Sequence, residues 1–131
     1  MTVPEYLSLL ERGIYEDRHV ELWEGWVVER MPHGPLPVTL ILLISEWLLQ
    51  RRPKAAAVRP QAPVQLRESC PEPDIAVVRG VTTDFRERLP IASEILLLVE
   101  VSDSTLKDDR RIKARMYAGA NVPEYWIVNC E

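Results

Sequence analysis

The chain has 131 residues, of which 47% are hydrophobic and 27% are charged, and its formal net charge is -4. This length and composition suit one folded domain with a single core and exclude a disordered chain. The negative charge argues against non-specific nucleic-acid binding by the whole surface, but it leaves room for a local basic patch. The longest apolar stretch, 36–49, is interrupted by polar residues and is too short to cross a bilayer, so we expect no membrane segment.

The cysteines and the two ends of the sequence lead to expectations about the cellular location of the protein and the limits of its domain. Cys70 and Cys130 lie far apart and match no metal-ligand spacing, so we predict reduced thiols rather than a disulfide. The first residues hold no basic segment followed by an apolar run, so we expect no signal peptide and a cytoplasmic location. Glu131 directly follows a predicted strand, which is a poor place for a chain to stop. We therefore expect 1–131 to be a single domain that is truncated at its C-terminal end.

The first half of the chain predicts a helix, a hairpin and a second helix. Apolar residues at helical spacing indicate a short helix at 3–12, which Gly13 would end. Partial alternation of apolar and polar residues around a central glycine indicates a β-hairpin at 20–29. A loop rich in proline follows. The Leu- and Ile-rich run 38–52 is long enough to favour a buried helix, which Pro53 would stop.

The middle of the chain predicts three strands. The segment 58–66 holds two prolines and is therefore expected at the edge of a sheet. The short apolar run 74–78 is typical of a buried strand, and the polar segment 80–92 of a loop with at most a helical turn. The run 95–101 is apolar on both faces, which predicts the central strand of the sheet.

The last part of the chain predicts a helix and one more strand. Ser104 or Thr105 can cap a helix from 106 to 118, which Gly119 would end, and 124–128 is the final strand. The element order is then αββαβββαβ. This order predicts an α/β fold of the mixed α+β kind, with helices flanking a mixed sheet. The final strand–helix–strand unit implies a parallel, right-handed crossover.

Two carboxylates stand out against their apolar surroundings. Glu100 lies inside the predicted central strand, where an unpaired charge is costly and calls for a cation or a metal; alternatively, it reaches solvent at the strand end. Asp74 opens a neighbouring strand after the rigid Pro71-Glu72-Pro73 lead-in, or it is simply part of a proline-rich turn. Two such oxygen ligands suit Mg²⁺ or Mn²⁺, whereas the chain offers no Cys/His set for zinc.

Lys113 is a candidate third member of this group. It lies in a basic helix that should point Ile112 and Met116 towards the sheet, and it borders that inward face. From there its side chain could bend towards the carboxylates. The alternative is a solvated helix face on which Lys113 pairs with Asp109, four residues earlier.

Five segments of the chain resemble successive blocks of a known protein family. They are 20–29, 71–78 (PEPDIAVV), 98–105 (LVEVSDST), 109–113 (DRRIK) and 117–126 (YAGANVPEYW). In this order and at these gaps they are similar to the Uma-type endonucleases, a bacterial branch of the PD-(D/E)xK, or restriction endonuclease-like, nuclease superfamily. The resemblance covers nearly the whole chain.

The resemblance implies a set of catalytic residues. In the superfamily pattern Asp74 and Glu100 would bind the divalent metal, Mg²⁺ or Mn²⁺. The superfamily lysine usually stands two residues after the second acid, where this chain has Ser102. In this family the lysine maps instead onto Lys113 of the following helix. Glu21 matches an acidic position of the first hairpin and would complete the site.

The chain departs from the family pattern at two places. Many relatives carry a histidine near the start of the first long helix, where this chain has Val38. Any role of that histidine is therefore expected to be absent here, and the nearby His33 is interpreted as a loop residue. Relatives also continue beyond the last strand, which agrees with the expected truncation.

The resulting hypothesis is metal-dependent phosphodiester hydrolysis, with DNA as the expected substrate. A catalytically idle nuclease fold is the alternative. It would act as a binding or dimerisation domain, with its tryptophans at an interface and a homodimer as one outcome. Hydrolysis of another phosphodiester or nucleotide is a further option. Several basic residues could contact phosphates or merely carry solubilising charge. These are Arg51, Arg52, Lys54, Arg110, Arg111 and Arg115.

Overall fold

The computed structural model describes residues 1–102 and 107–130. The described elements, in chain order, are α1 (Val3–Glu11), β1 (Val20–Trp23), β2 (Trp26–Glu29), α2 (Pro35–Arg51), β3 (Ala56–Pro60), β4 (Ile75–Arg79), the 3₁₀ turns η1 (Thr82–Phe85) and η2 (Ala92–Glu94), β5 (Ile95–Ser102), α3 (Lys107–Gly119) and β6 (Tyr125–Asn129). Apart from the two 3₁₀ turns, this is the predicted order αββαβββαβ, and the fold is mixed α/β as expected. The predicted helix cap at Ser104 or Thr105 lies outside the described residues.

The main sheet has the strand order β3-β4-β5-β6. The β3–β4 and β4–β5 pairs are antiparallel, and β5 pairs with β6 in parallel. The predicted parallel crossover through the last helix is therefore confirmed, and so is the interior position of the 95–101 run. The predicted edge position is confirmed for β3, which overlaps the start of the segment with two prolines and has Pro60 as its last residue.

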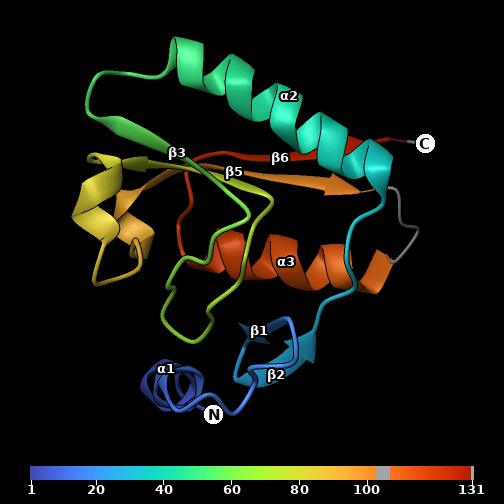
Figure 1. Cartoon of the computed structure of the whole chain (residues 1–131), viewed down its shortest axis with the longest axis vertical. Coiled ribbons are helices and arrows are strands. Elements are labelled where there is room, and N and C mark those ends of the chain that lie inside the picture. Colours follow the sequence, from blue (N-terminus) through green and yellow to red (C-terminus); the bar gives the residue numbers. More distant parts are fainter. Residues whose placement is uncertain (103–106, 131) are drawn as a thin grey trace.

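Helices cover both faces of this sheet, with α2 above it and α3 below it in Figure 1. Alternation along the strands separates two apolar clusters, because successive side chains point to opposite faces. One cluster joins Ile41 and Leu48 of α2 to Ile75, Val77, Leu97 and Val99. The other joins Met116 and Tyr117 of α3 to Ala76, Val78 and Leu98. Odd-numbered residues of β4 thus face α2, and even-numbered ones face α3.

The β1–β2 hairpin and α1 form a separate unit beyond α3 (Figure 1). Its two-residue turn places Glu24 and Gly25 at φ of 50° and 88°, as a type I′ turn requires. The hairpin is attached to the rest of the chain through Leu22, which forms a bridge with Cys70 and packs with it and Tyr6 in a third apolar cluster. This attachment fixes β1 beside the segment that leads into β4.

Two predicted boundaries were wrong because of prolines. Helix α2 begins at Pro35, three residues before the predicted start, since proline is tolerated in the first turn, where backbone N–H groups lack helical partners. The strand predicted at 58–66 runs instead from Ala56 to Pro60, and Pro63 lies outside it. Both cysteines are free thiols, as expected.

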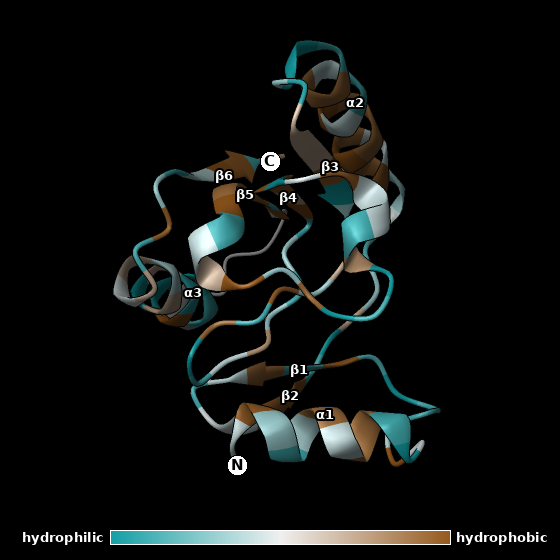
Figure 2. Cartoon of the chain, turned by 90° about the vertical axis from the view of Figure 1, so that its left-hand side faces the viewer, coloured by the Kyte–Doolittle hydropathy of each residue, from teal (hydrophilic) through white to brown (hydrophobic). Residues whose placement is uncertain are grey.

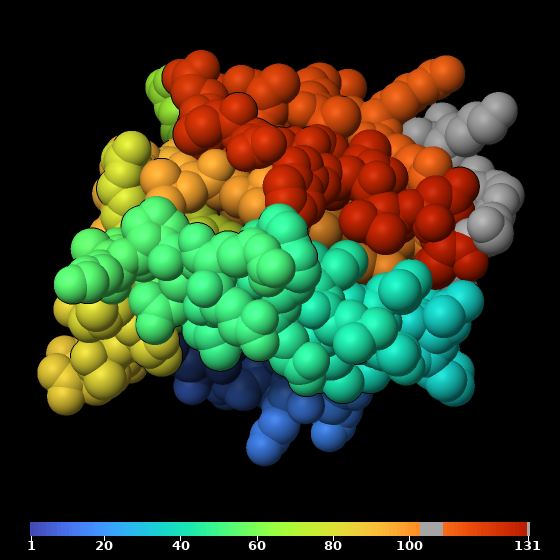
Figure 3. Space-filling view, turned by 90° about the horizontal axis from the view of Figure 1, so that it is seen from above, coloured from blue at the N-terminus to red at the C-terminus, as the bar shows by residue number. Residues whose placement is uncertain are grey.

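Helix α2 is mostly apolar, as its brown colour in Figure 2 shows, and part of this apolar character lies on its outer surface. Its exposed residues include Leu36, Val38, Leu42, Leu43, Trp47 and Leu49. A shallow hollow between α2 and β6 is lined by Leu43, Ile44, Trp47, Trp126 and Val128, and Figure 3 looks onto this face, with the red C-terminal segment beside α2. Trp23, by contrast, is buried, so the four tryptophans do not share one surface. Within residues 1–102 and 107–130, no helix is long and apolar enough to cross a membrane.

The two-faced packing predicts a large difference between two leucine truncations. Leu98 is fully buried in the centre of the sheet, whereas the side chain of Leu42 is exposed on α2. Leu98→Ala should lower the free energy of unfolding by about 2–5 kcal/mol, and Leu42→Ala should change it by less than about 0.5 kcal/mol. Urea denaturation measures both values. Equal losses in the two variants would contradict the assignment of the core.

Candidate active site

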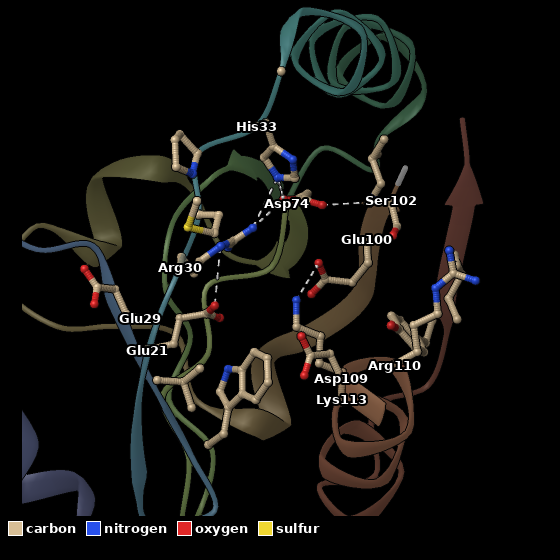
Figure 4. Close-up of a pocket in the computed structure, with 18 residues that line it drawn as sticks. Glu21, Glu29, Arg30, His33, Asp74, Glu100, Ser102, Asp109, Arg110 and Lys113 are labelled. Carbon is tan, nitrogen blue, oxygen red and sulfur yellow. Dashed lines mark hydrogen bonds and ion pairs between the residues drawn. The ribbon is translucent and has the colours of Figure 1, made fainter. Parts of the chain in front are cut away.

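A pocket of about 360 Å³ opens between the hairpin, the ends of β4 and β5, and α3. Figure 4 shows the labelled side chains of this pocket that point towards one another, which are Glu21, Arg30, His33, Asp74, Glu100 and Lys113. All four residues proposed from the sequence line it: Glu21, Asp74, Glu100 and Lys113. Segments far apart in the chain therefore meet at one place.

Asp74 and Glu100 stand across from each other on one face of the sheet. In the β4–β5 register Ile75 pairs with Val99 and Ala76 with Leu98, so the next pair outward is Asp74 with Glu100. Both lie on the α3 side, as do Ala76 and Leu98 two residues away, because successive side chains of a strand point to opposite faces. The two residues are only 1% and 5% exposed. Glu100 therefore does not simply reach solvent at the strand end.

Asp74 is held by three donors. Its Oδ2 atom accepts a hydrogen bond from the backbone N–H of Val101 at 2.7 Å. Its Oδ1 atom lies 3.0 Å from Nη2 of Arg30 and 2.7 Å from Nε2 of His33. A buried carboxylate with this many partners has a well-defined orientation.

Glu100 is bound by two residues of α3. Lys113 Nζ lies 3.1 Å from its Oε2 atom, and the hydroxyl of Tyr117 donates to its Oε1 atom at 2.8 Å. Lys113 and Tyr117 are four residues apart and so project from the same side of the helix. Burial raises the pKa of Glu100 to about 7, against the lowering effect of Lys113 and with a further increase from Asp74.

The environment of Lys113 decides between the two interpretations of the basic helix. Its side chain is 14% exposed and forms its ion pair with Glu100. Its ammonium group also lies 5.3 Å from the centre of the Trp23 ring. The residue therefore points into the pocket rather than along a solvated helix face.

Glu21 is buried as well, at 1% exposure, although a hairpin carboxylate is usually on the surface. Its Oε1 atom accepts the backbone N–H of Glu72. Its Oε2 atom accepts no hydrogen bond from the described residues, and it lies 3.4 Å from Nε of Arg30. The bridge between Leu22 and Cys70 holds β1, and Glu21 with it, beside the segment that leads into Asp74.

Three pocket or near-pocket residues were missing from the sequence-based set: Arg30, His33 and Tyr117. Tyr117 was detectable, because it follows Lys113 by one helical turn on an inward-facing helix. His33 lies in a loop, as predicted, and its ring contacts Asp74. No periodic pattern marks His33 or Arg30, because both follow the last residue of β2 and precede α2.

The donor chemistry of the pocket suits a hard divalent cation. Glu21, Asp74 and Glu100 offer carboxylate oxygens, the ligands that Mg²⁺ and Mn²⁺ prefer. Glu21 Oε2 is buried without a hydrogen bond from the described residues, which leaves it available to a cation. No group of three potential ligands is already assembled in the part of the chain that the structure describes. Binding of a metal ion would therefore require these carboxylates to move closer together.

Two comparisons with known proteins each find a similarity to proteins described as nucleases. Residues 3–131 match a protein family described as "Uma2: Putative restriction endonuclease". The fold is similar to the crystal structure of "a putative nuclease belonging to DUF820" from Anabaena variabilis ATCC 29413, with a TM-score of 0.65. The two chains are 15% identical, and the match covers 98% of this chain and 74% of that one. At this identity the likeness establishes the fold. A search of the curated proteins finds no match.

The raised pKa of Glu100 generates a prediction about stability. Because its pKa is about 7 in the folded chain and 4.5 in the reference state, the folded protein holds the extra proton between these values. The associated stability is complete below about pH 4.5 and is lost as the pH rises through about 7. Glu100→Gln cannot ionise, so between about pH 5 and 8 it should lose less stability than the wild type, by up to about 3 kcal/mol. Urea denaturation across this range measures the difference.

A matched control exists on the surface. The pKa of Glu94 is lowered to about 2 by its hydrogen bonds from Arg88 and the backbone of Ile91. Glu94 is therefore ionised throughout this pH range in both folded and unfolded chains. Glu94→Gln should leave the pH dependence unchanged, and a parallel profile for Glu100→Gln and the wild type would contradict the prediction.

Proposed function

We propose that this chain, which belongs to the Uma2 family of restriction endonuclease-like proteins, is a nuclease that hydrolyses phosphodiester bonds with a divalent metal ion. One observation carries the proposal: Asp74 and Glu100 lie opposite each other on one sheet face, with Lys113 at Glu100. Family membership supports nuclease function in general. The metal, the residue roles and the DNA substrate are the further content of the proposal.

Each residue has a distinct role in this mechanism. Asp74 and Glu100 would hold Mg²⁺ or Mn²⁺, with Glu21 available as a further oxygen ligand. When bound, such an ion acidifies a water molecule and neutralises charge that grows on the scissile phosphate. Lys113 lies at Glu100 and would orient the attacking water or stabilise the phosphate charge electrostatically. Tyr117 keeps Glu100 in place by donating to its other oxygen.

The substrate is proposed to be DNA, and the protein to act in the bacterial cytoplasm. Nuclease family membership supports a nucleic acid as substrate. Of the basic residues that either contact phosphates or only carry solubilising charge, Arg110 lines the pocket beside Lys113. Arg51 lies over the ring of Trp47, and Arg115 pairs with Glu24 at the edge of the hairpin. The phosphate path is therefore proposed to pass the pocket mouth near Arg110.

The alternative, an idle nuclease fold used for binding or dimerisation, is favoured by two observations. The first is that Arg30 and His33 already occupy Asp74. The second is the apolar outer surface of α2 around Trp47, which a second copy of the chain could cover as a homodimer. Such a domain would bind no metal through Asp74 and Glu100.

Three isosteric changes test the nuclease proposal. Asp74→Asn, Glu100→Gln and Lys113→Met each remove one charge and keep the shape of the side chain. Each should lower Mg²⁺-dependent cleavage of plasmid or single-stranded DNA by at least about 100-fold, because charge stabilisation in the transition state is lost. Cleavage assays at saturating Mg²⁺ measure the rates, and circular dichroism confirms that each variant folds.

Matched controls come from outside the pocket. Glu24→Gln and Arg115→Met remove one carboxylate from the hairpin and one cation from α3 and should leave cleavage unchanged. Calorimetric titration with Mn²⁺ distinguishes a nuclease from a catalytically idle fold, because an idle fold gives no metal binding that depends on Asp74 and Glu100. Full cleavage by Lys113→Met would remove that residue from the mechanism.

A further inference from the structure

Arg30 has no role in the proposed function, yet it lies at the centre of the acidic groups. Its side chain is 12% exposed. Its Nη2 atom lies 3.0 Å from Asp74 Oδ1, its Nε atom 3.4 Å from Glu21 Oε2, and its Nη1 atom 3.6 Å from Glu72 Oε2. The same Nη1 atom also donates to the backbone carbonyl of Glu72. One guanidinium thus bridges two of the proposed metal ligands.

The positive charge of Arg30 is stabilised by the carboxylates around it. Burial by itself lowers the pKa of Arg30, but Glu21, Asp74 and Glu100 raise it above its ordinary value. Buried carboxylates without a cation are costly, and removing the partner of a buried charge is strongly destabilising. Arg30 therefore compensates Glu21 and Asp74 when no other cation is present.

A metal ion at Asp74 conflicts with this arrangement. The Oδ2 atom already accepts the N–H of Val101, and Oδ1 faces both Arg30 and His33. An ion bound to Asp74 at the usual distance of about 2.0–2.6 Å would face a guanidinium that contacts the same carboxylate. Two cations so close repel strongly in a poorly solvated pocket. The ion and Arg30 cannot both keep full contact with Asp74.

We infer that Arg30 is the counter-cation of the metal-free site and that a divalent ion competes with its guanidinium for Asp74. The inference rests on the proposed function, because it takes Asp74 as a metal ligand. On metal binding, Arg30 leaves Asp74 and stays anchored by the backbone carbonyl and the carboxylate of Glu72. Arg30 is thus a positioning residue that sets how tightly the site binds its metal.

Mn²⁺ affinity distinguishes competition from a purely structural role. Arg30→Met removes the competing charge and should bind Mn²⁺ at least about tenfold more tightly than the wild type, measured by calorimetry. Arg30→Lys keeps a cation and should stay close to wild-type affinity. Arg115→Met, a surface control for the loss of one positive charge, should bind as the wild type does. A structural role alone would weaken binding or leave it unchanged in Arg30→Met.

A second measurement needs no destabilised variant. Arg30→Met removes the cation from the buried carboxylates of Glu21 and Asp74, so its affinity is measured only if the variant folds. In the wild type, ¹⁵N-detected side-chain NMR follows the Nε–H signal of Arg30, assigned by its loss in Arg30→Lys. Saturating Mg²⁺ should shift this signal, while the Arg115 signal stays in place.

The outcomes separate the inference from the proposed function. Metal binding by the wild type with a shifted Arg30 signal, together with tighter binding by Arg30→Met where that variant folds, supports both. Binding only by Arg30→Met supports the competition and overturns the nuclease proposal, since Arg30 then blocks the site permanently. Wild-type binding with an unmoved Arg30 signal, or with equal or weaker affinity in Arg30→Met, overturns the inference alone. No binding by either protein overturns both.

Discussion

The burial of Asp74 and Glu100 on one face of the central sheet is the constraint around which the rest of the pocket is arranged. Each carboxylate removed from water needs compensation, and the chain supplies it from different directions. Glu100 receives Lys113 and Tyr117 from α3, and Asp74 receives Arg30 from the segment after the hairpin. Helix α3 is therefore linked to β5 through Glu100, and the segment after the hairpin is linked to the start of β4 through Asp74. These polar contacts add to the apolar packing of the same elements.

The N-terminal unit completes the pocket. Helix α1 and the hairpin pack with Cys70 through Leu22, which holds β1 against the segment that leads into β4. Without this unit, Asp74 would keep its backbone partner but lose Arg30, and Glu21 would be absent. The main sheet with α2 and α3 forms the structural core, and the hairpin forms one side of the pocket.

Much of the fold and part of the site follow from local sequence patterns. Apolar runs and their alternation are enough to find the strands and to place Asp74 and Glu100 on neighbouring ones. The predicted boundaries of α2 and β3 were wrong near prolines. In the sequence, a proline in the first turn of a helix cannot be distinguished from a proline in a loop. Lys113 borders the inward helix face, so its direction depends on packing that no pattern specifies, and only the family resemblance favoured it.

Arg30 and His33 could not have been found in the same way. Both lie in an irregular segment between a strand and a helix, where no period relates sequence to direction. Their position depends on where the hairpin attaches, which is set by contacts between distant segments such as Leu22 and Cys70. The Trp residues illustrate the same point, since Trp23 packs inside while Trp26 is 77% exposed.

The wide spacing of the pocket residues has a consequence for folding. Glu21, Asp74 and Lys113 come from the first, middle and last parts of the chain, and the parallel β5–β6 pair closes only after α3 has crossed the sheet. Contacts between such distant segments carry a large loop-closure cost and form late. A nascent or partly unfolded chain therefore has no assembled pocket. Any chemistry of the pocket is confined to molecules that have completed their topology.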